Sequence, residues 1–100
     1  MSFSHFLHPK AYQDIIEAYE WYENQQQGLG DKFAKAVEKK ILSITFSPLA
    51  NSIKSNMDFR EVLINTFPFI IVYKVNEIEK SIFISSIHHS SKHPKRKFRK

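Results

Sequence analysis

The sequence contains no cysteine among its 100 residues. This absence excludes a disulfide framework, a thiolate metal site and a cysteine nucleophile, and it suits a reducing cytosol. Long apolar runs are missing too, since no stretch approaches the roughly 20 residues that span a bilayer. The N-terminus also lacks the basic region and unbroken apolar run of a signal peptide. We therefore expect a cytoplasmic protein with no membrane partner.

Acidic residues are absent after Glu79, whereas the last nine positions carry six lysines and arginines. The whole chain has fifteen basic and ten acidic side chains, a net charge of +5, and its remainder without those six carries about −1. A basic end on a nearly neutral body suits nucleic acid or an acidic protein surface, although a solubilising, frayed terminus explains the same charges. The predicted target-binding residues are Lys92, Lys95, Arg96, Lys97, Arg99 and Lys100.

A chain of this length forms one domain around one core, to which nine Phe, four Tyr and one Trp contribute. No repeat, low-complexity tract or Gly/Ser linker divides it. We expect a single domain over residues 1–92, followed by a basic tail over residues 93–100.

The first half of the chain predicts a strand and two helices. Residues 3–7 alternate as in a strand, and Pro9 suits the first turn of a helix that ends near Asn24. Gly28 and Gly30 are expected to supply left-handed backbone in the following turn, with Asp31 as N-cap of the second helix. Two helices joined so closely should lie antiparallel. The two apolar stripes are Ala11, Ile15, Ala18 and Tyr22 on the first helix, and Phe33, Val37, Ile41 and Ile44 on the second, which should end by Ser47-Pro48.

The second half changes to the alternating and apolar patterns of a sheet. Residues 59–65 alternate, residues 67–75 are almost continuously apolar, and residues 81–88 are rich in isoleucine. Pro68 suits a strand start, and residues 76–80 suit a hairpin turn. The fold class is therefore α+β, with the order β-α-α-β-β-β. We expect the helix hairpin to pack on one face of a small, mostly antiparallel sheet with the apolar strand at its centre.

Several short motifs follow one another along the whole chain. They are Asp14-Ile15, Trp21-Tyr22-Glu23, the turn of residues 27–30 followed by Phe33, the helix end from Ile44 to Pro48, Arg60, Phe67-Pro68-Phe69 with Tyr73, and the segment 87–94. In these motifs the chain resembles the RelE/ParE superfamily of toxins from type II toxin–antitoxin systems. The resemblance implies the same β-α-α-β-β-β core, a cognate antitoxin with a partly disordered segment that wraps the toxin, and a target in translation or DNA topology.

The superfamily has two chemistries. ParE-like members bind DNA gyrase and need no hydrolytic site, whereas RelE-like members resemble ribosome-dependent endoribonucleases that cut mRNA. RNA cleavage by the 2′-hydroxyl needs a base, an acid and a cation beside the charged phosphorus. For that alternative, His88 or His89 would act as base or acid, Arg60 and Lys92 would hold phosphate, and Tyr73 would be a secondary donor.

Departures from the ribonuclease pattern favour the gyrase-binding toxin. Ribonuclease members carry an arginine early in the strand that here reads Phe69 to Tyr73, and this chain is apolar there. Lys54 is the one lysine or arginine between Lys40 and Arg60. The Phe-Pro-aromatic strand start and the His-x-Ser-Lys-x-Pro ending resemble ParE-like sequences, although Lys92 stands where related sequences usually have arginine. Whether the protein is an enzyme stays open, and the ribonuclease remains the alternative.

Structural explanations compete for several of these residues. His88 and His89 are neighbours on a strand and face opposite ways, so one should pack inside and the other meet solvent. His88, His89 and His93 are close in sequence, but no cysteine and no obvious carboxylate accompanies them as further zinc ligands. We therefore expect no metal and no cofactor. Arg60 suits a structural ion pair as well as a functional contact.

Trp21 and Tyr22 lie on the first helix among glutamates, whose negative field repels a nucleic-acid backbone. Core packing or a hydrophobic anchor for the antitoxin explains them better than base stacking.

Overall fold

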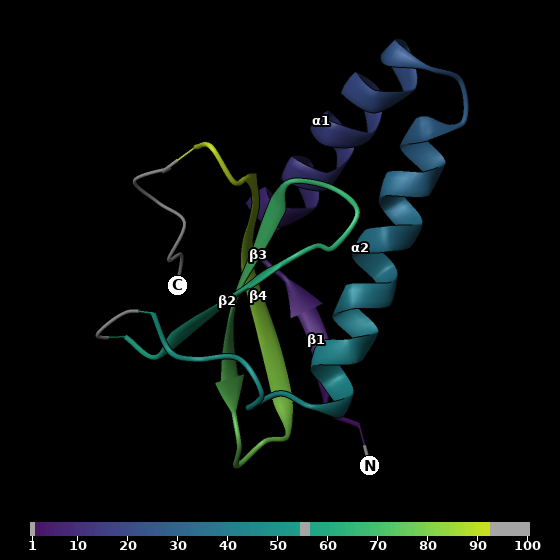
Figure 1. Ribbon diagram of the computed structural model, residues 1–100. Helices are drawn as coiled ribbons and strands as arrows, with labels where there is room; N and C mark the ends of the chain where they lie inside the picture. The colour runs from purple at the N-terminus through teal and green to yellow at the C-terminus, as the bar shows by residue number, and fades with distance from the viewer. Residues whose placement is uncertain (1, 55–56, 93–100) are drawn as a thin grey trace.

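A computed structural model describes residues 2–54 and 57–92. The elements in chain order are β1 (Ser4–Leu7), α1 (Pro9–Gln25), α2 (Leu29–Phe46), β2 (Phe59–Leu63), β3 (Phe69–Asn76) and β4 (Ser81–His89). The helices form an antiparallel hairpin whose turn projects away from the sheet (Figure 1). The α+β class and the predicted element order are confirmed. The predicted basic tail, residues 93–100, lies outside the described residues.

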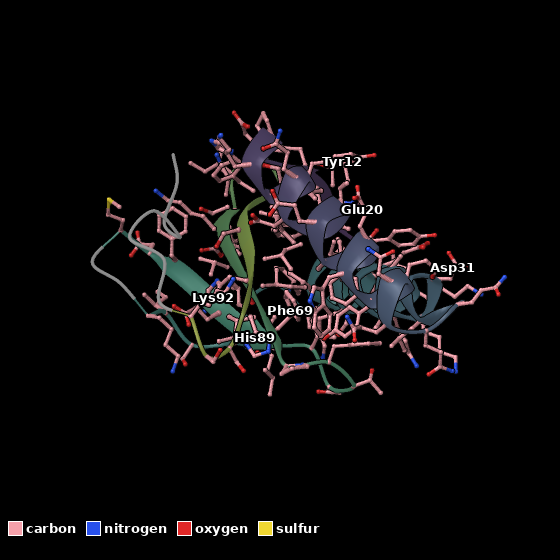
Figure 2. The ribbon with its side chains drawn as sticks, turned by 90° about the horizontal axis from the view of Figure 1, so that it is seen from above. Tyr12, Glu20, Asp31, Phe69, His89 and Lys92 are labelled. Carbon is pink, nitrogen blue, oxygen red and sulfur yellow. The ribbon has the colours of Figure 1, made fainter. Side chains whose placement is uncertain are left out.

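α1 begins at Pro9, as predicted, because proline has no amide hydrogen to satisfy in a first helical turn. His8 is its N-cap, and the His8 Nδ1 atom accepts the backbone N–H of Lys10 at 3.0 Å. Tyr12 and Glu20 lie on the outer side of the helix, away from Phe69 and His89 (Figure 2). One face of α1 is therefore committed to the sheet and the opposite face is exposed.

The turn between the helices differs from its prediction in two ways. Only Gly28, among the described glycines, has a positive φ, of 88°, and α2 begins at Leu29 with Gly28 as N-cap, so Asp31 is not the cap and Gly30 is not left-handed. The Glu23 carboxylate accepts the backbone N–H groups of Gly28 and Gly30, each at 3.0 Å, and so satisfies the start of α2 from the other helix. Gly30 instead permits close packing, since an added Cβ atom would lie 2.8 Å from the Tyr19 carbonyl oxygen.

The sheet has the strand order β1-β4-β3-β2. β1 pairs with β4 in parallel, while β2–β3 and β3–β4 are antiparallel, so the predictions of a mostly antiparallel sheet and a central β3 are confirmed. A β-bulge occurs where Val72 pairs with Ser86 but Tyr73 pairs with Ile84, which leaves Ser85 as the extra residue. The bulge brings Ile84 and Ile87, three residues apart, to the same core side.

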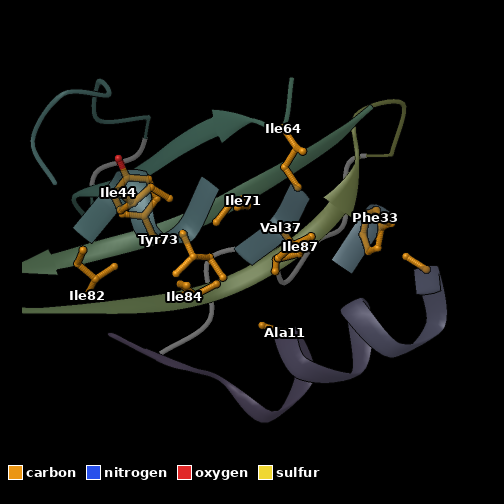
Figure 3. Packing of buried hydrophobic residues seen from close by; sticks show 12 residues of the cluster. Ala11, Phe33, Val37, Ile44, Ile64, Ile71, Tyr73, Ile82, Ile84 and Ile87 are labelled. Carbon is orange, nitrogen blue, oxygen red and sulfur yellow. The ribbon is translucent and has the colours of Figure 1, made fainter. Parts of the chain in front are cut away.

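The core fills the space between the helix hairpin and one face of the sheet. Phe33 packs against Phe67 and Phe69 with ring centroids 5.4 and 5.0 Å away, and Tyr22 joins them from α1. The predicted stripe of α2 is buried in full, and Figure 3 shows it facing the isoleucines of β3 and β4. α2 ends at Phe46, one residue before Ser47-Pro48, as predicted. The buried cluster comprises Ala11, Ala18, Phe33, Val37, Ile41, Ile44, Ile64, Ile71, Tyr73, Ile82, Ile84 and Ile87.

Candidate functional site

Arg60 and Tyr73 are paired across β2 and β3 and belong to one polar network. An Arg60 guanidinium N–H donates to the Asn51 carbonyl oxygen, and the Asn51 side-chain amide donates to the Tyr73 hydroxyl oxygen at 3.0 Å. The Tyr73 hydroxyl in turn faces the Pro48 carbonyl oxygen at 3.5 Å. These contacts hold the segment that follows α2 against the sheet. Arg60 and Tyr73 therefore both stabilise the fold.

Tyr73 is fully buried, and its hydroxyl belongs to this hydrogen-bonded network. Burial raises the pKa of this hydroxyl, while the hydrogen bond from Asn51 and the charge of Arg60 act in the opposite direction. The raised pKa keeps the hydroxyl protonated, which suits a hydrogen-bond donor and does not suit a general base.

His88 and His89 face opposite sides of the sheet. His88 pairs with Ile70 and is only 8% exposed, whereas His89 pairs with Phe69, contacts its ring at a centroid distance of 5.3 Å and is half-buried. The His89 Nδ1 atom accepts the backbone N–H of Ser91 at 3.1 Å and lies 2.8 Å from the Ser91 hydroxyl. Because Nδ1 accepts, the neutral ring carries its hydrogen on Nε2.

The structure does not gather the five residues named for RNA cleavage into one site. Tyr73 lies four positions along β3 from Phe69, the partner of His89, which corresponds to about 13 Å of strand. His88 faces the other side of the sheet from His89 and from Tyr73. The two pairs that do come together are Arg60 with Tyr73, and His89 with Lys92, whose backbone N–H donates to the His89 carbonyl oxygen at 3.0 Å. His88 lines the same cavity as the second pair, although its side chain belongs to the opposite face of the sheet.

A cleft of about 750 Å³ opens beside His89, between α1 and the ends of β3 and β4. Its apolar surface comes from a chain of rings: Trp21 stands edge-on to Tyr22 at 5.1 Å, and Tyr22 lies 6.1 Å from Phe69. Phe69, His89 and Lys92 mark the wall opposite α1 in Figure 2. The lining residues are Asp14, Glu17, Ala18, Trp21, Tyr22, Pro68, Phe69, Ser86, Ile87, His88, His89, Ser91 and Lys92.

The two walls of the cleft carry opposite charges. Asp14 and Glu17 line it from α1, and Lys92 lines it from beyond the end of β4. The Asp14 carboxylate also accepts the backbone N–H of Ile87 at 3.1 Å, which ties α1 to β4 at the base of the cleft. Trp21 is 59% exposed, an unusual position for the largest apolar side chain of the protein. A cleft of this kind suits a protein segment better than a small anion.

The cleft was not predicted from the sequence, although the pattern that forms its α1 wall is visible there. Residues 14, 17, 18 and 21 are spaced to share one face of a helix, which predicts a stripe of carboxylates ending in a tryptophan. The other wall could not be placed, because nothing local in the sequence says that the end of β4 lies beside the middle of α1. Of the six predicted target-binding residues, Lys92 lines the cleft and the other five lie outside the described residues.

In the described part of the chain, no group of three or more His, Cys, Asp or Glu residues could hold a metal ion. Of the helices found between residues 2 and 92, none has the length and apolar character that a membrane crossing requires.

Comparison with known proteins finds one matching family model and several similar folds. A family model described as the ParE toxin of type II toxin–antitoxin system, parDE, matches residues 6–94. No match was found among curated proteins.

Three solved structures have similar folds. A chain of the chromosomal ParDE toxin–antitoxin system from P. aeruginosa has a TM-score of 0.65 at 20% identity, over 88% of this chain and 96% of that one. The isolated E. coli RelE toxin gives 0.64 at 16% identity, over 94% and 89%. The intact E. coli RelBE toxin–antitoxin complex gives 0.63 at 16% identity, over 88% and 96%. At these identities the three likenesses establish the fold.

Proposed function

This chain belongs to the ParE toxin family of type II toxin–antitoxin systems, and we propose that it inhibits bacterial growth by binding DNA gyrase and is neutralised by a cognate antitoxin. The observation that carries the proposal is the family match, which runs over residues 6–94 and so includes every described helix and strand apart from the first two residues of β1. Inhibition by binding needs a surface and no assembled acid–base pair, which agrees with the dispersed positions of Arg60, Tyr73 and His88.

The antitoxin is supported by the similar structures, since the E. coli RelBE structure is a toxin–antitoxin complex and the P. aeruginosa structure is of a ParDE system. In this chain the cleft is a surface that suits such a partner. It offers the exposed ring of Trp21 and the ring of Phe69, with charges of both signs at its walls. We place the apolar anchor of the antitoxin there.

The basic end of the chain is the proposed gyrase contact. Lys92 begins it at the mouth of the cleft, and the remaining cations follow in sequence. An antitoxin seated in the cleft would therefore also cover the start of the basic segment, which joins neutralisation to target binding. The residues concerned are Lys92, Lys95, Arg96, Lys97, Arg99 and Lys100.

Cleavage of mRNA on the ribosome is the second candidate function. One observation favours it: His89 is partly exposed with its Nδ1 occupied as an acceptor, which leaves Nε2 for proton transfer, and Lys92, three residues further on, lines the same cleft. In that case His89 would be the acid or base and Lys92 the phosphate contact, without help from Arg60 or Tyr73.

Controlled expression of the chain in a bacterial host separates the two functions. Transcripts are mapped by primer extension with translation active and blocked, and gyrase–DNA cleavage complexes are trapped from the same cultures. The proposal expects intact messages, trapped gyrase–DNA breaks and recovery of growth when the antitoxin is co-expressed.

His89→Gln is the control variant, because it removes proton transfer and retains a polar side chain of similar size. Under the proposal it stays toxic. Translation-dependent cuts that disappear in this variant would instead establish the ribonuclease, and a neighbouring gene product that neither binds nor neutralises the toxin would refute the antitoxin part.

A further inference from the structure

The cleft combines two features that attract the same kind of group. The rings of Trp21, Tyr22 and Phe69 present aromatic surface, and Glu17 lies one helical turn before Trp21 on α1. Aromatic faces attract cations through their quadrupole, and carboxylates attract them by charge. Both attractions strengthen where water is displaced, as it is when a cleft is filled.

The α1 wall presents a continuous stripe of side chains to the cleft. Ala18, which has the smallest side chain of the stripe, lies between Glu17 and Trp21. Asp14 continues the stripe one turn earlier, and its bond from the Ile87 backbone fixes the position of its carboxylate. The stripe therefore joins an aromatic ring to two carboxylates.

The distribution of charge along α1 points the same way. The helix carries Asp14, Glu17, Glu20 and Glu23 against the single cation Lys10. Glu23 is engaged by the backbone of Gly28 and Gly30, so it contributes to the turn. Lys92 lies on the opposite wall, where it would repel a cation placed near it and so favours the α1 side for a positive group.

We propose that the cleft receives a cationic side chain, an arginine flanked by apolar residues, from the segment of the antitoxin that occupies it. This inference rests on the proposed antitoxin partner and adds what that partner must present. The flat guanidinium stacks on the Trp21 ring and reaches the Glu17 carboxylate, and the flanking apolar residues cover Phe69 and Tyr22. Arginine fits better than lysine because a planar group can stack and can donate two parallel hydrogen bonds to a carboxylate.

Trp21 provides a direct measurement, since it is the only tryptophan of the chain and its fluorescence reports on the cleft alone. The probes are three acetylated and amidated pentapeptides with leucine and alanine on both sides of one variable position. That position holds arginine, citrulline, which is a neutral group of nearly the same shape, or glutamate. We expect the arginine peptide to change Trp21 fluorescence with an affinity at least about tenfold tighter than the citrulline peptide.

Two charge-removing variants on the same helix give a matched control. Glu17→Gln should weaken the arginine peptide to the level of the citrulline peptide. Glu20→Gln removes the same charge from a residue on the outer side of α1, outside the cleft lining, and should change binding by less than about twofold. If both variants lose the same affinity for the arginine peptide, the attraction comes from the overall negative charge of the helix. That result would overturn the proposed site at Glu17.

Three other outcomes overturn the proposal. They are equal binding of the arginine and citrulline peptides, tighter binding of the glutamate peptide, and no response to the arginine peptide up to about 10 mM, a concentration that populates even weak contacts. The assay uses neither gyrase nor cells. A toxin that binds the arginine peptide but leaves gyrase untouched therefore refutes only the gyrase target, while a gyrase inhibitor that ignores the peptide refutes only the cation site.

Discussion

The stretch of β3 around Tyr73, which we name its closed end, and the start of the strand at Phe69, which we name its open end, treat polar groups in opposite ways. At the closed end Asn51 bonds to both Arg60 and Tyr73, the Tyr73 hydroxyl faces the Pro48 carbonyl oxygen, and the tyrosine is fully buried. Near Phe69 the rings and charges of the cleft face an open volume of about 750 Å³. A single strand thus has a closed end that stabilises the fold and an open end that is available to a partner. The comparison teaches that residue type alone does not mark a site, since the arginine and tyrosine belong to the closed end.

The largest effect on stability should come from removing the Tyr73 ring at the closed end. Tyr73→Ala removes a fully buried ring and its hydrogen bonds, so we expect a loss of about 3–5 kcal/mol in the free energy of unfolding. Chemical denaturation of the purified protein measures this. A loss below about 1 kcal/mol would mean that this end is not the stabilising one.

The next largest effect should come from a substitution in the cleft at the open end, and it should appear in the affinity for the antitoxin. Trp21→Ala removes an exposed anchor, so we expect antitoxin affinity to fall by about 2 kcal/mol, roughly thirtyfold, while the free energy of unfolding changes by less than about 1 kcal/mol. Calorimetric titration with the co-expressed antitoxin measures the first quantity, and denaturation measures the second. If stability falls as much as in Tyr73→Ala, the distinction between the ends fails.

A smaller effect should follow from removing only the Tyr73 hydroxyl. Tyr73→Phe keeps the ring and leaves the Asn51 amide without its acceptor, so we expect a destabilisation of about 1 kcal/mol at neutral pH. An unchanged protein would show that the network near Arg60 is incidental. Urea denaturation at pH 7 is sufficient for this comparison.

The same variant, Tyr73→Phe, should also change how the free energy of unfolding falls at alkaline pH. Because burial raises the Tyr73 pKa above the unfolded value near 10, the unfolded chain releases its proton first as pH rises. The stabilisation is fully present below pH 10 and is lost as pH climbs from there through the folded pKa. Denaturation between about pH 9 and 12 should show a shallower fall in Tyr73→Phe. The pKa values of Tyr19 and Tyr22 are also raised, Tyr19 by its hydrogen bond to Asp31 and Tyr22 by burial, so some fall in stability should remain in the variant.

The smallest effect on stability should come from His89→Ala. The ring contacts Phe69 and caps the turn at Ser91, but it is half-buried, so we expect a loss of about 0.5 kcal/mol. Thermal unfolding would show a correspondingly small shift. A loss above about 2 kcal/mol would place His89 with the closed end.

Local patterns predicted most of the fold, because the spacing of Phe33, Val37, Ile41 and Ile44 already defines the buried face of α2. The predicted start of α2 was wrong because Gly28 is the N-cap and the N–H groups there are satisfied by Glu23 of the other helix, a contact that no local rule predicts. Arg60 could not be assigned for the same reason, since its partner is a backbone carbonyl of Asn51 in a loop. The cleft depends on a further long-range fact, the position of β4 beside α1.

The parallel pairing of β1 with β4 has a consequence for the order of events in synthesis. Ser4 pairs with Ser81, so the earliest strand of the described chain must wait for the latest before the sheet can close. Such distant pairings slow folding, because a long loop loses entropy before it gains contacts. The wall of the cleft that follows β4 forms with the same event. The cleft therefore cannot form until β4 has left the ribosome, which leaves time for a partner already present to meet the toxin as it folds.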